Sequence, residues 1–127
     1  MNLTKNFKRE EFDCKCGCEM PNDVLGSVRV LAEHLQAIRD ASKAPISINS
    51  AYRCPDHNKA IGGVSNSQHV LGKASDINIK GWSADKTADF IEELHNKWKN
   101  RSGGLGRYNT FTHIDIRNAY ARWDNRK

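Results

Sequence analysis

The stretch S-Q-H-V-L-G-K-A-S-D, residues 67–76, constrains the fold more than any other part of the chain. It places an imidazole, His69, and a carboxylate, Asp76, on either side of Gly72. This spacing fits neither one face of a helix nor a phosphate-binding loop. A chain that turns at Gly72, where a positive φ costs little, brings both side chains back to one point.

A third polar side chain, His113 in the run F-T-H-I-D-I-R, completes a set of metal ligands. Two histidines and one carboxylate leave the fourth position of a tetrahedral zinc ion open for water, as in catalytic rather than structural sites. Taken singly, a histidine is more often a packing or surface residue, and Asp76 suits a turn or a cap. Together His69, Asp76 and His113 predict a zinc site, because each lies at a strand edge beside glycine-rich turns.

Two short segments alternate apolar and polar residues, as strands with one buried face do. In residues 74–80 the isoleucines are expected to face the core, with Asp76 on the opposite side. In residues 111–117 the same alternation places His113 and Asp115 together, away from the core. We therefore expect Asp115 beside the ligand, within reach of its second ring nitrogen or of an attacking water.

Two amphipathic helices are predicted from apolar residues that recur every three or four positions. The first starts with a cap at Asn22 or Asp23 and ends near the next proline. The second spans residues 84–99 after a cap at Ser83, with His95 on its surface or flank. Its predicted core stripe is Ala88, Ile91, Leu94 and Trp98.

Two helices and three or four short strands in this order indicate an α+β fold with a small, largely antiparallel sheet. The 127 residues suit a single domain, residues 1–127, with a hydrophobic core of its own. Residues 1–22 are expected to form a lead-in anchored by Phe7 and Phe12, followed by a cysteine-rich loop.

Composition and charge narrow the function classes. No apolar run approaches the ~20 residues of a membrane span, and the N-terminus lacks the apolar segment of a signal peptide, so synthesis in the cytoplasm is expected. The net charge of +5 favours polyanions such as nucleic acid, anionic lipid or acidic cell-wall polymer. The basic residues are scattered, without a recognition helix or aromatic–basic alternation, so we do not expect nucleic-acid binding. We also expect a monomer that does not bind membranes.

Four cysteines form the other unusual feature: Cys14, Cys16 and Cys18 in C-K-C-G-C, and the distant Cys54. Without a signal peptide, disulfides are not the default. The four could surround a structural zinc ion, although C-x-C-x-C is tighter than the usual C-x2-C knuckle. A disulfide, a second metal site and free thiols all remain open, with a structural connection between this loop and Cys54 preferred.

The pattern S-x-H-x6-D, followed by a distal H-x-D, resembles the zinc D-alanyl-D-alanine carboxypeptidases and the phage L-alanyl-D-glutamate endolysins. These are LAS metallopeptidases, which share their fold with the hedgehog signalling domain. The segments S-A-Y-R-C-P-D-H-N, G-G-V-S-N-S-Q-H, G-G-L-G-R-Y and F-T-H-I-D-I-R are similar to the small, single-domain members. Matching segments run from about Ile46 to Trp123, with a weaker match in the cysteine-rich region.

The resemblance implies zinc ligands at His69, Asp76 and His113. It also implies that Arg53, at the exit of a predicted strand, holds substrate and stabilises the developing oxyanion; a surface salt bridge is the alternative. Ser67 and Gln68 are then expected to line the substrate cleft, or else only to make turn hydrogen bonds.

One position departs from the family pattern. Many relatives carry the general base as Glu or Asp three residues before the last histidine ligand, where this chain has Thr110. Asp115 is the predicted replacement, taking a proton from the attacking water and delivering it to the leaving amine. The alternative is that Asp115 only orients His113, with catalysis weak or absent. His57 is a weaker candidate for the base.

The resemblance therefore implies a zinc peptidase that cuts a peptidoglycan stem-peptide bond adjoining a D-amino acid, as an endolysin-like endopeptidase or a carboxypeptidase. The positive charge is compatible with an anionic wall, and the lack of a signal peptide fits a phage or prophage enzyme released from the cell. Two other classes remain: a non-catalytic, zinc-containing module that binds the cell wall, and a metal-stabilised structural component, for example of a phage tail.

Overall fold

A five-stranded sheet contains both of the alternating segments. The computed structural model describes residues 1–127, and the strand order is β1-β2-β4-β3-β5. The strands are β1 (Ile46–Ser50), β2 (Ala74–Ile79), β3 (Gly103–Arg107), β4 (Thr112–Asp115) and β5 (Tyr120–Asp124). Neighbours are antiparallel except β3 and β5, which run parallel. This confirms the predicted α+β fold with a largely antiparallel sheet, with one strand more than expected.

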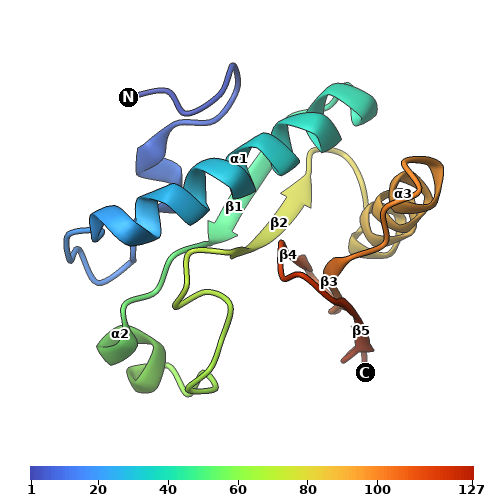
Figure 1. Ribbon diagram of the computed structural model, residues 1–127. Helices are drawn as coiled ribbons and strands as arrows, with labels where there is room; N and C mark the ends of the chain where they lie inside the picture. The colour runs from blue at the N-terminus through green and yellow to red at the C-terminus, as the bar shows by residue number, and fades with distance from the viewer.

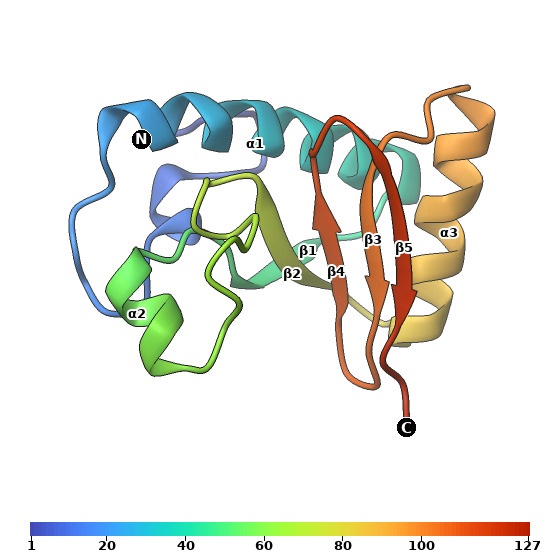
Figure 2. The same cartoon turned by 60° about the horizontal axis from the view of Figure 1, so that its bottom comes forward.

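Two long and two short helices accompany the sheet. They are η1 (Arg9–Phe12, a 3-10 helix), α1 (Asn22–Ser42), α2 (Pro55–Ala60) and α3 (Ala84–Lys97). The helix α1 runs along the sheet near β1 and β2, whereas α3 lies beside β3 and β5 (Figure 1). The short α2 stands at the opposite end of the molecule from α3 (Figure 2). None of the helices combines the length and the apolar character that a membrane crossing requires.

The ends of the long helices follow from the residues that flank them. The residue before α1 is Pro21, and no side-chain hydrogen bond caps this end, so the predicted cap at Asn22 or Asp23 is wrong. The helix ends where Lys43 adopts a left-handed conformation, with φ of 57°. The cap of α3 is the predicted one, because Ser83 Oγ accepts a hydrogen bond from Lys86 N at 3.1 Å.

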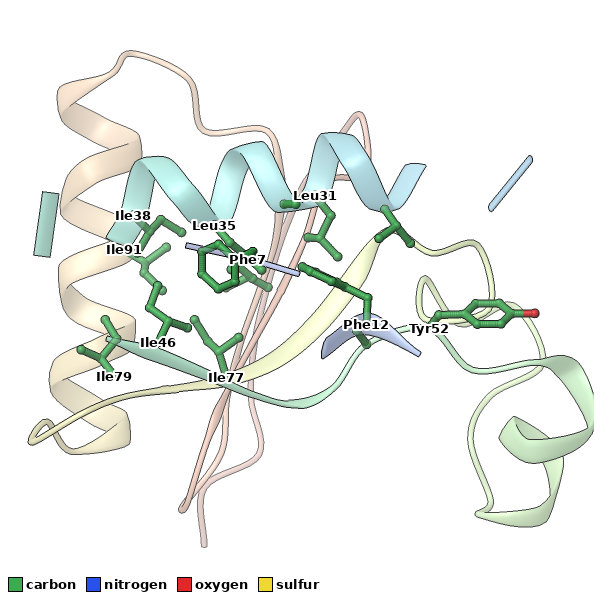
Figure 3. Packing of buried hydrophobic residues seen from close by; sticks show 14 of the residues in the cluster. Phe7, Phe12, Leu31, Leu35, Ile38, Ile46, Tyr52, Ile77, Ile79 and Ile91 are labelled. Carbon is green, nitrogen blue, oxygen red and sulfur yellow. The ribbon is translucent and has the colours of Figure 1, made fainter. Parts of the chain in front are cut away.

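The apolar stripes of both long helices pack against one face of the sheet (Figure 3). The buried cluster includes Val28, Leu31, Leu35 and Ile38 of α1, Ile91 and Leu94 of α3, and Ile46, Ile77, Ile79, Leu105 and Ile114 of the strands. Phe7 and Phe12 are also buried, with ring centroids 6.3 Å apart, so the lead-in is anchored as predicted. Side chains alternate between the two faces of the sheet along a strand. Because the isoleucines occupy the buried face, Asp76 and His113 lie on the opposite face.

Two residues near the end of α3 differ from the prediction. Trp98 follows the last residue of the helix and is 39% exposed instead of lying in the core stripe. His95, expected at the surface, is 2% exposed, because β5 brings Arg122 against it: Arg122 Nη2 lies 3.2 Å from His95 Nδ1. The ring of His34 on α1 packs against these two residues, at 5.4 Å from His95 and 6.3 Å from Trp98.

Acidification should destabilise the protein through His34. Burial, followed by the nearby His95, lowers the pKa of His34 to about 4, against about 6.5 in an unfolded chain. The folded protein binds this proton more weakly, so the free energy of unfolding should fall by up to about 3 kcal/mol between pH 6.5 and pH 4. Urea unfolding at both pH values measures the loss, which His34→Gln should reduce. An equal loss in the variant would assign the effect to other groups.

Candidate functional site

A pocket of about 770 Å³ opens beside the sheet face that bears Asp76 and His113. Six of the seven predicted site residues line it: Arg53, Ser67, Gln68, His69, Asp76 and His113. The seventh, Asp115, is not among the lining residues and lies behind His113. The fold thus brings together side chains from the β1–α2 connection, the turn before β2, and strands β2 and β4.

The three proposed ligands converge because of strand register and one turn. Asp76 and His113 are direct partners on β2 and β4, so their side chains share one face. His69 lies three residues before Gly72, which has φ of +72° and turns the chain into β2 as predicted. The ligand atoms of His69, Asp76 and His113 all lie within 4.8 Å of one another.

Each histidine has one ring nitrogen held by a partner outside the cluster. Nδ1 of His69 lies 2.6 Å from Ala51 O, which can only accept, so this nitrogen bears the proton and Nε2 is free. Nε2 of His113 lies 2.8 Å from the carboxylate of Asp115, which likewise leaves Nδ1 of His113 free. Both free nitrogens face Asp76, at 3.4 Å for His69 and 3.1 Å for His113.

The donor set fits zinc. Burial raises the pKa of Asp76, but hydrogen bonds from His113 and His69 in their protonated forms outweigh it and lower the pKa to about 2, so the carboxylate is ionised at neutral pH. A zinc ion would take the place of the proton that these bonds require. Two imidazole nitrogens without a proton and one ionised carboxylate are the ligands of a zinc site that keeps a fourth position open. Deprotonated ligands, short separations and outer hydrogen bonds that fix both rings are what such a site requires.

Asp115 lies in a closed environment on the far side of the His113 ring. Its side chain is fully buried, and its Oδ1 accepts hydrogen bonds from Gly104 N and Arg117 Nε, both at 2.8 Å. Its Oδ2 lies 2.8 Å from His113 Nε2 and 2.7 Å from Arg117 Nη2. Burial raises the pKa of Asp115, but the bonds from His113 and Arg117 hold it well below its usual range. These contacts suit a carboxylate that orients a ring, and they leave it little capacity to take a proton.

Two arginines border the pocket. Arg53 Nη1 donates to Asn58 Oδ1 at 3.0 Å, and its Nη2 lies 3.6 Å from Asp76 Oδ2, beside the proposed ligands. Arg117 lines the pocket and lies over the ring of Trp123, with its guanidinium carbon 5.4 Å from the ring centroid. Asp76 is the only acidic residue that lines the pocket.

Ser67 and Gln68 lie at the pocket edge and also support the turn. Ser67 Oγ accepts a hydrogen bond from His69 N at 3.1 Å, which is the turn-forming role considered above. The backbone oxygen of Gln68 accepts from Leu71 N and Lys73 N, whereas its side-chain Oε1 is buried without a partner. Both side chains are therefore placed where a substrate could meet them, and the substrate-binding role stays a prediction.

An aromatic wall that the sequence did not reveal completes the pocket. Trp123 Nε1 donates to Tyr108 Oη at 3.0 Å, and Tyr108 stacks on Phe111 at 4.5 Å. The Trp123 ring also lies 4.9 Å from the ring of His113. Trp123 reaches this position because β5 pairs with β3, where its partner is Gly106 and any Cβ would overlap the indole. The glycines that alternate in G-G-L-G were the available signal, since they indicate a side chain lying across the strand.

A methyl group at Gly104 should disturb the site by displacing the carboxylate of Asp115. A Cβ there would overlap the Asp115 carboxylate, so Gly104→Ala is expected to lower the free energy of unfolding by about 1–3 kcal/mol. Gly26 of α1 is the matched control: it is exposed, nothing lies within 4 Å of its added Cβ, and alanine there should stabilise the helix by roughly 0.5–1 kcal/mol. Urea unfolding compares the two. Equal stability of the variants would contradict the close contact at Asp115.

Comparisons with known proteins agree with this geometry. The family model described as Peptidase M15 matches residues 5–115, a range that includes His69, Asp76 and His113. The zinc D-Ala-D-Ala carboxypeptidase of Streptomyces albus G is 34% identical over 87 residues, which cover 58% of this chain and 34% of that protein. The chain thus spans about a third of the length of this relative.

Proposed function

Because the chain belongs to the Peptidase M15 family, we propose that it is a zinc-dependent peptidase that hydrolyses a peptidoglycan stem-peptide bond adjoining a D-amino acid. The observation that carries this proposal is the cluster of His69, Asp76 and His113 at the pocket, with ligand atoms within 4.8 Å of one another. The name of the Streptomyces relative, a D-Ala-D-Ala carboxypeptidase, supports the substrate class, since D-Ala-D-Ala ends a peptidoglycan stem peptide. A net charge of +5 favours approach to an anionic wall.

In this proposal the three ligands prepare a reactive centre and the other residues act around it. A zinc ion held there supplies a Lewis acid that polarises a carbonyl oxygen and lowers the pKa of bound water to about 7. Ala51 O and Asp115 fix the two imidazole rings, so that each presents an unprotonated nitrogen to the centre. Asp76 remains ionised beside them.

The arginines provide positive charge for binding and for the transition state. In our proposal Arg53, whose Nη2 lies 3.6 Å from Asp76 Oδ2, donates to the oxygen that becomes negative when the amide is attacked. Arg117 is held by the buried Asp115 with its side chain at the pocket. Asp115 occupies Nε and Nη2 of this guanidinium group. We assign Nη1, which Asp115 does not contact, to a carboxylate of the substrate, because stem peptides carry free carboxylates and charge-assisted hydrogen bonds are strong. The aromatic wall of Tyr108, Phe111 and Trp123 would cover the apolar side of the peptide.

Asp115 is proposed as a positioning residue for His113 and Arg117 rather than as the general base. The pocket then offers no carboxylate apart from the ligand Asp76. This one observation favours a second candidate function, in which the protein binds wall peptides at the same centre without cutting them. The two candidates share the fold and the zinc ligands, and they differ only in turnover.

Digestion of purified peptidoglycan tests the proposal. Zinc-loaded protein should release new amino and carboxyl termini, and the fragment masses identify the bond: loss of one terminal residue indicates a carboxypeptidase, and separation of larger fragments an endopeptidase. Protein stripped by a chelator, then reloaded with zinc, is the control. Zinc-loaded protein that releases nothing from several wall types but sediments with the insoluble wall would favour the binding module. Protein that does neither would favour a structural component.

A further inference from the structure

Four cysteine side chains meet where the N-terminal lead-in touches the start of α2. Cys14, Cys16 and Cys18 come from one loop, and Cys54 is the residue directly before the helix. The Sγ atom of Cys14 lies 3.3 Å from that of Cys16 and 3.9 Å from that of Cys54, and those of Cys16 and Cys54 are 3.5 Å apart. All four sulfur atoms lie within 4.8 Å of one another, and none forms a disulfide.

The sulfur separations match those in a tetrahedral zinc–thiolate site. With zinc–sulfur bonds of about 2.3 Å, neighbouring sulfur atoms of a regular tetrahedron are about 3.8 Å apart. Thiols are weak hydrogen-bond donors and acceptors, so their mutual contacts alone explain little of this convergence. Four thiolates fill every position of the tetrahedron, which is the arrangement of a structural rather than a catalytic zinc ion.

The local backbone accounts for the unusually tight C-x-C-x-C spacing. Gly17 has φ of +85°, a conformation that glycine adopts without strain. Its N–H donates to Cys14 O at 3.0 Å, which closes a turn that brings the flanking sulfur atoms together. Backbone N–H groups also point at the sulfur atoms: Cys54 N donates to Cys14 Sγ and His57 N to Cys54 Sγ, each at 3.4 Å. Donors aimed at sulfur stabilise the thiolate form that binds metal.

We propose that this chain holds a structural zinc ion, separate from the pocket centre, through Cys14, Cys16, Cys18 and Cys54. The ion joins positions 40 residues apart and so closes a long loop. A metal connection of this kind stabilises the folded state by restricting the unfolded chain. It adds to the apolar packing that the buried Phe7 and Phe12 already give the lead-in.

The second ion also has a consequence for the pocket. Cys54 directly follows Arg53, and Tyr52 N donates to Phe12 O at 3.1 Å, so the lead-in and the Arg53 segment are already paired by backbone. The same segment supplies Ala51 O, the partner of His69 Nδ1. The cysteine-bound ion therefore fixes the chain that positions both the proposed oxyanion donor and one ligand ring.

Cobalt substitution separates the two centres by spectroscopy. Reduced, metal-free full-length protein is reconstituted with cobalt(II), because cysteine ligation gives a thiolate-to-cobalt charge-transfer band in the near ultraviolet and histidine or carboxylate ligation does not. Wild type and His69→Ala should both show the band. Cys16→Ser/Cys18→Ser should lose most of it and bind about one zinc ion less per chain. Lys15 is exposed between two of the cysteines, so Lys15→Ala is the matched control. This variant should retain the charge-transfer band and bind as much zinc as the wild type.

The outcomes decide the proposal without reference to peptidase activity. A missing band in reduced wild-type protein overturns it, and so does a full band in the double cysteine variant. If that variant fails to fold, the wild-type and His69→Ala spectra still decide, since neither changes a cysteine. A reduced wild-type protein whose four thiols react equally fast with Ellman's reagent, with and without zinc, also overturns it.

Discussion

Replacing His69 by alanine should remove the zinc ion from the pocket and abolish peptidoglycan cleavage. In the proposed site this side chain supplies one of the three ligand atoms, and the two remaining ligands would hold zinc poorly. We expect zinc affinity at this centre to fall by well over the 10–100-fold that follows loss of an outer hydrogen-bond partner. Zinc content after dialysis at defined free zinc, together with fragment release from peptidoglycan, measures both effects.

A second histidine provides the control for this experiment. His57 lies on α2, close in sequence to Arg53, but does not line the pocket. His57→Ala should retain zinc and cleavage at wild-type levels, which would also remove it as a candidate base. Circular dichroism should confirm that His69→Ala is folded. This check is needed because the ring is buried and bonded to Ala51 O. Wild-type affinity for the pocket zinc in folded His69→Ala would contradict its assignment as a ligand.

The sequence predicted the sheet and the convergence of His69, Asp76 and His113, because both follow from strand periodicity and one turn. Alternation in residues 74–80 and 111–117 correctly separates core isoleucines from Asp76 and His113. A glycine between His69 and Asp76 correctly predicts a turn, which has a positive φ at Gly72. Such features need only the period of two of a strand and the conformational freedom of glycine.

The features that the sequence did not reveal depend on contacts between distant segments. The C-terminal residues form β5, a strand that the sequence did not predict, because their backbone pairs with β3. This pairing buries His95 through Arg122 and places Trp123 on His113, and both contacts join segments that are distant in the sequence. Likewise, alternation placed Asp115 on the face of His113 but could not show which ring nitrogen its carboxylate would meet, because that depends on side-chain rotamers.

Asp115→Asn separates the two roles considered for this carboxylate. If Asp115 positions His113, the side-chain amide of the new asparagine should bind Nε2 of His113 less strongly than the carboxylate does. Zinc affinity should then fall by about 10–100-fold. Cleavage should then return to within a few-fold of wild type once zinc is saturating. If Asp115 were the general base, kcat should fall by about 10²–10⁴-fold at every zinc concentration. Cleavage rate titrated against free zinc measures both quantities on one curve.

The contacts of Asp115 favour the first result. Its two oxygens receive bonds from Gly104, Arg117 and His113, and they lie at the ring nitrogen remote from the pocket. Asp89, an exposed aspartate of α3 paired with Arg107, is the matched control, and Asp89→Asn should leave the curve unchanged. Wild-type zinc affinity combined with lost cleavage in Asp115→Asn would restore the carboxylate as the base. It would also require the His113 ring to swing, so that the carboxylate reaches the pocket during turnover.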